Sequence, residues 1–97
     1  MSLNRHNPKR DANEPEIVDA LHDAGFWVIR VDKPVDLLVG KAGYLHFALL
    51  EVKLPGKDLN KKQQEFFQIS EGAMRFVVRS AGQAINVCNT WIIGGDA

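Results

Sequence analysis

Hydrophobic and polar residues follow two different periods along this chain, and each period predicts a different kind of element. Between Asn13 and Gly25, apolar side chains recur at helical spacing, which predicts a helix with Asn13 as its N-cap and Gly25 as its stop. Short runs rich in β-branched and aromatic residues predict strands. In chain order we predict a helix at 13–25, strands at 26–31, 35–40 and 44–53, a helix at 61–71, a strand at 75–79 and a helix at 81–90.

The strand predicted at 44–53, with the sequence YLHFALLEVK, is the one around which the others are arranged. Both of its faces are mostly apolar, which is typical of a central strand covered on two sides. Alternate side chains share a face, so Glu51 and Lys53 emerge from the same face of this strand. Charges are costly to bury unless they are paired or bound to a metal. The end of this strand is therefore the first candidate for a functional site.

The order of elements predicts an α/β fold with a mixed four-stranded sheet flanked by helices, in the order α-β-β-β-α-β-α. A chain of 97 residues is long enough for one domain with a modest core. We place that domain at 13–93, after a basic N-terminal arm at 1–12 and before a flexible tail at 94–97. The apolar segment 91–93 follows the last predicted helix, and we expect it to pack onto the sheet or onto a partner chain.

Composition argues against several classes of protein. The formal net charge is zero, so the molecule as a whole is not an electrostatic nucleic-acid binder. Cys88 is the only cysteine, which rules out an internal disulfide framework and a zinc site built on cysteines of this chain. His6, His22 and His46 lack the spacing of metal-binding motifs. No apolar run reaches the ~18 residues of a membrane-spanning helix and no signal peptide opens the sequence, so we expect a cytoplasmic protein.

The second and third predicted strands form a hairpin through residues 40–43, which brings the start of one strand near the end of the other. Asp36 lies at that start and Glu51 at that end, so both belong to one end of the sheet. A symmetric hairpin nevertheless places Asp36 opposite Phe47, ~13 Å short of Glu51. An asymmetric turn, a bulge or splayed strand ends must reduce this gap if both carboxylates are to hold one ion.

In the predicted arrangement four charged residues share this end of the fold: Glu14 at the start of the first helix, Asp36, Glu51 and Lys53. Two or three carboxylates with a backbone carbonyl make a hard-oxygen site that suits Mg²⁺ or Mn²⁺ better than zinc. A lysine cannot bind the ion, but it can stabilise a phosphate oxyanion or position and deprotonate a water. Phosphodiester hydrolysis usually requires a metal that lowers the pKa of its water and neutralises developing charge.

Simpler interpretations are open for two of the candidate residues. Glu14 is also explained as a first-turn acid that the helix dipole favours. Gln63 stands three residues after Asn60, which is the spacing of a capping box at the start of the second helix. In these interpretations neither side chain belongs to a site.

The spacing of Asp36, then fourteen residues, then Glu51-Val52-Lys53 resembles the motif of the PD-(D/E)xK nuclease superfamily, with Val35 where a proline often stands. More specifically, the chain resembles the virus-type replication-repair nuclease domain, VRR-NUC, from about residue 10 to residue 84. The further residues that carry this resemblance are Asn13-Glu14 at the first helix, Leu59 with Gln63, and Val77-Val78-Arg79-Ser80 before the last helix.

The resemblance implies a restriction-endonuclease-like core and a metal-dependent endonuclease that acts on branched or flapped DNA, such as four-way junctions. Lys53 would face the scissile phosphate, and Gln63 would be an accessory polar residue beside the site. Small stand-alone members resemble Holliday-junction resolvases in working as homodimers and often come from phage-like genomes, which implies the cytoplasm of a bacterial or phage-infected cell. The residues implied to face the Mg²⁺ or Mn²⁺ ion are Asp36, Glu51, Glu14 and, through its carbonyl, Val52.

Two other functions stay open. The first is a nucleic-acid-binding module of the same fold with a vestigial site, against which the presence of all four charged motif residues argues. The second is a sequence-specific, restriction-like nuclease, although a chain this short has little surface for a base-reading element. For the homodimer, the candidate interface combines the segment 91–93 with Phe66 or Phe67, which are adjacent and cannot both point inward from one helix.

Overall fold

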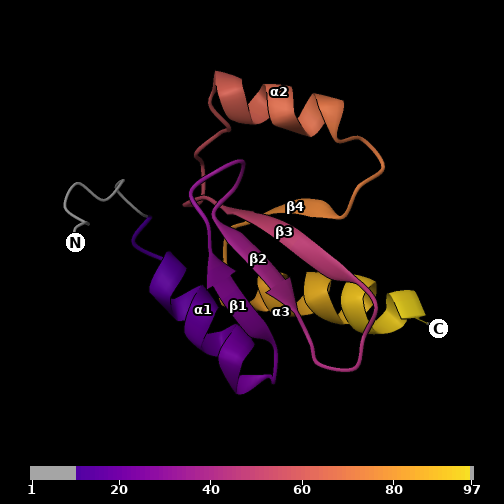
Figure 1. The fold of residues 1–97 in the computed structure, drawn as a ribbon. Helices are drawn as coiled ribbons and strands as arrows, with labels where there is room; N and C mark the ends of the chain where they lie inside the picture. The colour runs from indigo at the N-terminus through magenta and orange to yellow at the C-terminus, as the bar shows by residue number, and fades with distance from the viewer. Residues whose placement is uncertain (1–10, 97) are drawn as a thin grey trace, which may run out of the picture.

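The computed structural model describes residues 11–96, so all of the predicted basic arm except residues 11 and 12 lies outside the described residues. The elements follow one another in the predicted order of helices and strands, which confirms the mixed α/β class (Figure 1). Within residues 11–96, no helix combines the length and apolarity needed to cross a membrane. The elements are α1 (Glu14–Asp23), β1 (Trp27–Arg30), β2 (Leu37–Gly40), β3 (Phe47–Val52), α2 (Lys61–Ile69), β4 (Arg75–Val78) and α3 (Ala81–Cys88).

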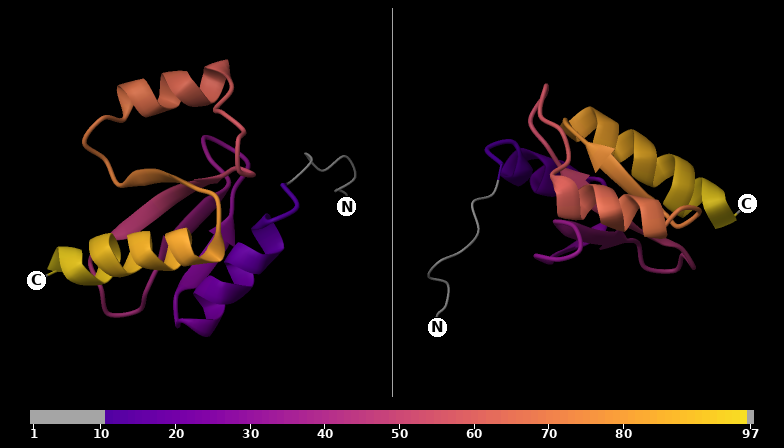
Figure 2. Two further views of the ribbon diagram at one scale, coloured as in Figure 1. Left: turned by 180° about the vertical axis from the view of Figure 1, so that it is seen from behind. Right: turned by 90° about the horizontal axis from the view of Figure 1, so that it is seen from above.

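A four-stranded sheet in the order β1-β2-β3-β4 is the centre of the fold. β1, β2 and β3 are antiparallel neighbours, whereas β4 runs parallel to β3. α1 and α3 lie side by side on one face of the sheet (Figure 2, left). Burial of the apolar side chains between these helices and the sheet is the main stabilising contribution to the fold. The fully buried members of this core include Ile17, Leu21, Leu37, Val39 and Leu50.

The opposite, outer face of the sheet is largely open, which corrects the prediction of a central strand covered on both sides. α2 contributes no buried residue and stands off from the strands (Figure 1). On the outer face Phe47 is 53% exposed and Trp27 is 40% exposed. Both pair with Gly40, where a Cβ atom would lie 2.2 Å from the Trp27 ring. Glycine leaves room there for the indole to lie across the strand.

β3 begins at Phe47, three residues later than predicted, and the connection from β2 is correspondingly longer. The chain turns at Lys41, whose carbonyl accepts the Tyr44 N–H at 3.1 Å, with Gly43 at a φ of 89°. The apolar sequence pattern continues through this connection, so it did not reveal where the strand starts.

This longer connection corrects the predicted register of the hairpin. Leu37 pairs with Leu50, and Gly40 pairs with Phe47. In the same register, Asp36 comes beside Glu51 rather than opposite Phe47. The two carboxylates therefore meet because the turn is displaced toward β3, which is the first of the three predicted ways to close the gap, and neither a bulge nor splayed strands are needed.

Most of the predicted helix signals are confirmed. Gly25, at a φ of 94°, follows α1, and the side chains of Asn60 and Ser80 cap α2 and α3. α2 and α3 each end two residues earlier than predicted. Asn13 stands at the N-cap of α1 but makes no side-chain capping bond, and its backbone is helical (φ −86°, ψ −3°) rather than extended.

The segment after α3 continues as a π-helical turn, Asn89–Ile93. Ile92 is fully buried, and the Trp91 ring stacks on Phe76 of β4 with ring centroids 5.9 Å apart. This segment therefore packs onto its own fold, which was one of the two predicted placements. Gly94–Asp96, in the predicted tail, form a 3-10 turn.

Candidate functional site

Polar side chains from separate segments meet at the end of β3 in a cavity of ≈210 Å³, here called the carboxylate cavity. The segment before α1, the residue before β2, the end of β3 and the start of α2 contribute to its lining. Of the residues predicted to act catalytically, all but Glu14 line it. The complete lining is Asp11, Asp36, Glu51, Val52, Lys53, Asn60 and Gln63.

Hydrogen bonds with the backbone hold Asp36 against the end of β3. Its N–H donates to the Leu50 carbonyl at 3.2 Å, and its Oδ2 accepts the Val52 N–H at 2.8 Å. The carboxylate thus satisfies a backbone donor at the end of the ladder. Glu51 lies between these two contacts, so the same bonds bring the acids together.

Glu51 is a buried carboxyl, 2% exposed, with another acid as its neighbour. Burial is the largest cause that raises its pKa, and the charge of Asp36 and a hydrogen bond with that side chain raise it further. Lys53 acts in the opposite direction, and the resulting pKa of Glu51 is about 8 instead of 4.5. Without a bound cation, Glu51 therefore keeps its proton at neutral pH.

Lys53 places an ammonium group beside this pair of acids. Its Nζ lies 3.7 Å from Glu51 Oε2, and its side chain is 16% exposed. The separation is longer than the ~2.7–2.9 Å of a direct charge-assisted hydrogen bond. The ammonium group is therefore near enough to favour the charged carboxylate, and it lines the cavity without a direct hydrogen bond to Glu51.

Gln63 joins α2 to the site with both ends of its amide. Its Oε1 accepts the backbone N–H of Asn60 at 2.9 Å, and the backbone N–H of Gln63 donates to Asn60 Oδ1 at 2.9 Å. The predicted capping box is therefore confirmed. Its Nε2 also donates to Glu51 Oε2 at 2.9 Å. Capping and contact with the candidate site, which the sequence left as alternatives, therefore occur together.

Glu14 takes a different position from the other predicted acids. It is 1% exposed at the start of α1 and is not among the residues that line the carboxylate cavity. Its Oε2 accepts a hydrogen bond from Arg30 Nε on β1 at 2.9 Å. This ion pair balances the buried charge, and the predicted contact of Glu14 with a metal stays a prediction.

Asn13 and Asp11 lie at this end of the sheet in roles that the sequence did not predict. Asn13 Nδ2 donates to the carbonyls of Lys53 at 3.1 Å and Arg79 at 3.0 Å, which ties together the ends of two parallel strands. Among the described residues, its buried Oδ1 has no hydrogen-bond partner. Asp11 lines the carboxylate cavity from the segment predicted to be an arm. A helix-cap pattern explained Asn13 fully, and no sequence signal set Asp11 apart.

The oxygen donors of the carboxylate cavity fit a small, hard cation. Within residues 11–96, no group of three or more histidine, cysteine, aspartate or glutamate side chains is arranged to hold a metal. Mg²⁺ does not need such a cage, since proteins usually bind it through one or two carboxylates together with waters and substrate phosphates. Asp36 and Glu51 supply that number, and a cation between them would replace the proton that now relieves their repulsion.

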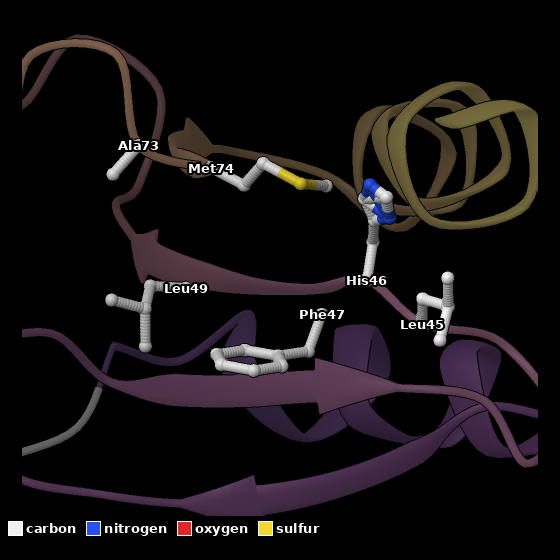
Figure 3. A pocket seen from close by; sticks show the side chains of 6 residues that line it. All are labelled: Leu45, His46, Phe47, Leu49, Ala73 and Met74. Atoms are coloured by element: carbon white, nitrogen blue, oxygen red, sulfur yellow. The ribbon is translucent and has the colours of Figure 1, made fainter. Parts of the chain in front are cut away.

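A second hollow, of ≈330 Å³, lies toward the start of β3 and differs in character. In Figure 3 the Met74 side chain points toward the His46 ring. With one histidine and no acid in its lining, this hollow offers no pair of groups for acid–base or metal-assisted chemistry. Its lining consists of Leu45, His46, Phe47, Leu49, Ala73 and Met74 (Figure 3).

No family model, curated protein or solved structure matches this chain. What the protein does is therefore inferred from the chemistry of the carboxylate cavity.

The raised pKa of Glu51 predicts how stability depends on pH in the metal-free protein. Between pH 4.5, the ordinary value, and about pH 8, the native state keeps a proton that the unfolded chain releases. Stability should therefore fall as pH rises through this interval, by on the order of 1 kcal/mol per pH unit, and level off above it. Glu51→Gln should lack this decline. Urea unfolding in chelator at a series of pH values measures both, and parallel curves for the two proteins would contradict the prediction.

The contact between Gln63 and Glu51 predicts a coupling energy that capping alone does not produce. Gln63→Ala and Glu51→Ala, combined in a double-mutant cycle, should show a coupling of about 1 kcal/mol in the free energy of unfolding. Asn60→Ala is the matched control, because it removes the capping acceptor and leaves the Gln63 side chain in place. Its effect should add to that of Glu51→Ala within about 0.5 kcal/mol. Equal coupling in both cycles would show that Gln63 acts only as a cap.

Proposed function

We propose that this protein is a Mg²⁺- or Mn²⁺-dependent DNA endonuclease with a restriction-endonuclease-like core, similar to VRR-NUC domains, that cuts branched or flapped DNA. The observation that carries the proposal is the pairing of Asp36 with Glu51 in one polar cavity, with Lys53 Nζ 3.7 Å from the Glu51 carboxyl. Two acids and a lysine at the end of neighbouring strands are the groups that metal-assisted phosphodiester hydrolysis needs.

Asp36 and Glu51, with the backbone carbonyl of Val52, would hold the cation. Such an ion, when bound, lowers the pKa of a water and neutralises the negative charge that develops on the phosphate. Lys53 is free to turn from Glu51 toward a phosphate oxygen, where its charge stabilises the same developing anion. Glu14 is held by Arg30, so in this proposal it contributes to the ion only through an intervening water.

Gln63 is a positioning residue in this proposal. Its Nε2 donates to Glu51 Oε2, and its Oε1 is fixed by the Asn60 N–H, so the amide cannot rotate without losing one of the two bonds. The carboxyl of Glu51 is thereby kept in one orientation beside Asp36. An orientation fixed before the cation arrives lowers the cost of assembling the site.

The charge of the cavity argues against the alternative of a non-catalytic DNA-binding module. Without a cation, this acid pair shares a proton and still carries one negative charge, which offers no attraction to phosphate and so does not serve a surface whose only task is to bind DNA. The raised pKa of Glu51 shows that the pair also costs stability when no cation is bound. An unfavourable acid pair of this kind is typical of a catalytic site.

The decisive experiment incubates the protein with Mg²⁺ or Mn²⁺ and end-labelled four-way junctions, flaps and plain duplex. We expect cleavage of the branched substrates in preference to the duplex. The double variant Asp36→Ala, Glu51→Ala should lose both cleavage and Mn²⁺ binding measured by calorimetry. Lys53→Ala should lose cleavage but keep Mn²⁺ binding, since the ammonium group acts on phosphate or water rather than on the ion.

Lys57→Ala is the control for this series, because it removes an exposed lysine close in sequence that does not line the cavity. It should cleave like the wild type. Equal Mn²⁺ binding by the wild type and the double variant would refute the metal site. If folded Lys53→Ala cleaves within a factor of two or three of the wild-type rate, Lys53 is a solvated residue at the strand end with no role in cleavage.

The homodimer is part of the same proposal, because paired cuts across a junction need two active sites related by symmetry. Trp91 is 48% exposed beside Phe76, which leaves part of its ring for a second copy of the chain. Phe66 and Phe67 are both half-buried and meet edge to face, so the proposal retains Trp91 as the main interface residue.

Light scattering at micromolar concentration measures the oligomeric state. We expect twice the chain mass of 10.8 kDa for the wild type, and a lower proportion of dimer for Trp91→Ala. A mass that stays at that of one chain when concentration is raised, and when a four-way junction is added, would contradict the dimer.

A further inference from the structure

A third cavity, of ≈360 Å³, lies between the β1–β2 loop and α2, and we call it the loop–helix cavity. Asn60 and Gln63 line both this cavity and the carboxylate cavity, so a polymer that occupies one can continue into the other. Figure 1 shows the β1–β2 loop rising toward the start of α2. The volume falls in the ~300–1,000 Å³ range of small-ligand sites.

One wall of the loop–helix cavity is aromatic. Phe66 lies three residues after Gln63, on the same face of α2, and is half-buried. Its ring meets Phe67 edge to face with centroids 5.9 Å apart, and the Arg75 guanidinium lies 5.0 Å from the Phe67 centroid. Because α2 has no buried residue, Phe66 is braced by its neighbours rather than packed into the core. A ring held in this way is a platform on which a nucleobase of any type can stack.

The rim of the loop–helix cavity carries lysines from two separate elements, and Asp32, next to Lys33, is the one acid in its lining. Lys33 comes from the β1–β2 loop and Lys62 from the first turn of α2, and both are exposed. Ammonium groups on either side of an aromatic wall can neutralise the phosphates that precede and follow one nucleotide. The amide of Asn60 adds a group of the kind that bonds to base edges.

The geometry points to a binding subsite for one unpaired nucleotide of a DNA strand whose adjoining phosphate occupies the carboxylate cavity. The base stacks on Phe66, and the flanking phosphates contact Lys33 and Lys62. A base inside a duplex reaches such a cavity only after the cost of extrusion, whereas a base at a flap or junction is already free. The inference rests on the proposed nuclease function and names what that site recognises in its substrate, which is an unpaired base beside the cut.

Binding is measured by fluorescence anisotropy of a labelled oligothymidylate and a labelled duplex of equal length. Chelator is present, so that no cleavage is required and the contacts of the loop–helix cavity are measured without the cation of the carboxylate cavity. Phe66→Leu keeps an apolar side chain and removes the ring. It should lower affinity for the single strand between about 5- and 150-fold, the range for loss of one stacked base, and leave duplex affinity unchanged. Phe66→Tyr restores a ring and should bind like the wild type. Ile69→Ala is the control, since Ile69 is 84% exposed on the same helix, outside the cavity.

Variants of two adjacent lysines, one lining the cavity and one outside it, distinguish binding at the subsite from general electrostatic attraction. Lys62→Ala should lower single-strand affinity and reduce the slope of log affinity against log salt by about 1. Lys61→Ala removes the same charge one residue earlier, outside the cavity, and should have the smaller effect.

The outcomes distinguish failure of the subsite from failure of the nuclease proposal. If folded Phe66→Leu and Lys62→Ala bind the oligothymidylate like wild type while wild type cuts branched DNA, the subsite is overturned and the nuclease proposal stands. If the variants lose single-strand affinity as expected but wild type cuts no substrate with either metal, the subsite stands and the nuclease proposal falls. Equal losses for Phe66→Leu and Ile69→Ala would also overturn the subsite.

Discussion

Two acids held side by side at a buried strand end are the constraint on which the rest of this structure depends. Their charges repel strongly away from water, so the pair is tolerated only with a proton, a cation or several donors around it. The donors come from the same strand end and from a neighbouring helix: the Val52 N–H, the Lys53 ammonium group and the Gln63 amide on α2. The hairpin register and the start of α2 are both arranged to meet this requirement.

The same acid pair links folding to ligand binding. A ligand that binds only the native state raises the free energy of unfolding. The increase grows with the logarithm of the ratio of ligand concentration to dissociation constant. The core between the sheet and the helices α1 and α3 supplies the stability that lets an unfavourable pair persist at its edge. The buried core thus offsets the cost of the acid pair at the edge of the sheet.

The sequence was sufficient for the order of elements, because apolar periodicity and cap residues are local signals. It was insufficient for the pairing of Asp36 with Glu51, since register depends on where the turn between β2 and β3 is centred, and Tyr44 continued the apolar pattern of the strand. Gln63 was recognised both as a cap and as a site residue, but only geometry shows that one amide serves both contacts. Asn13 looked like an ordinary cap, and its contacts with β3 and β4 join residues far apart in the chain.

The exposed position of α2 has a consequence for the dynamics of the site. Because no residue of this helix is buried, its opening exposes little apolar surface and costs far less than global unfolding. We therefore expect the amides of α2 to exchange through local opening more readily than the amides of the central strands. Each opening withdraws the Gln63 amide from Glu51 without disturbing the core. We infer that a ligand that contacts both α2 and β3 favours the state in which Gln63 holds Glu51.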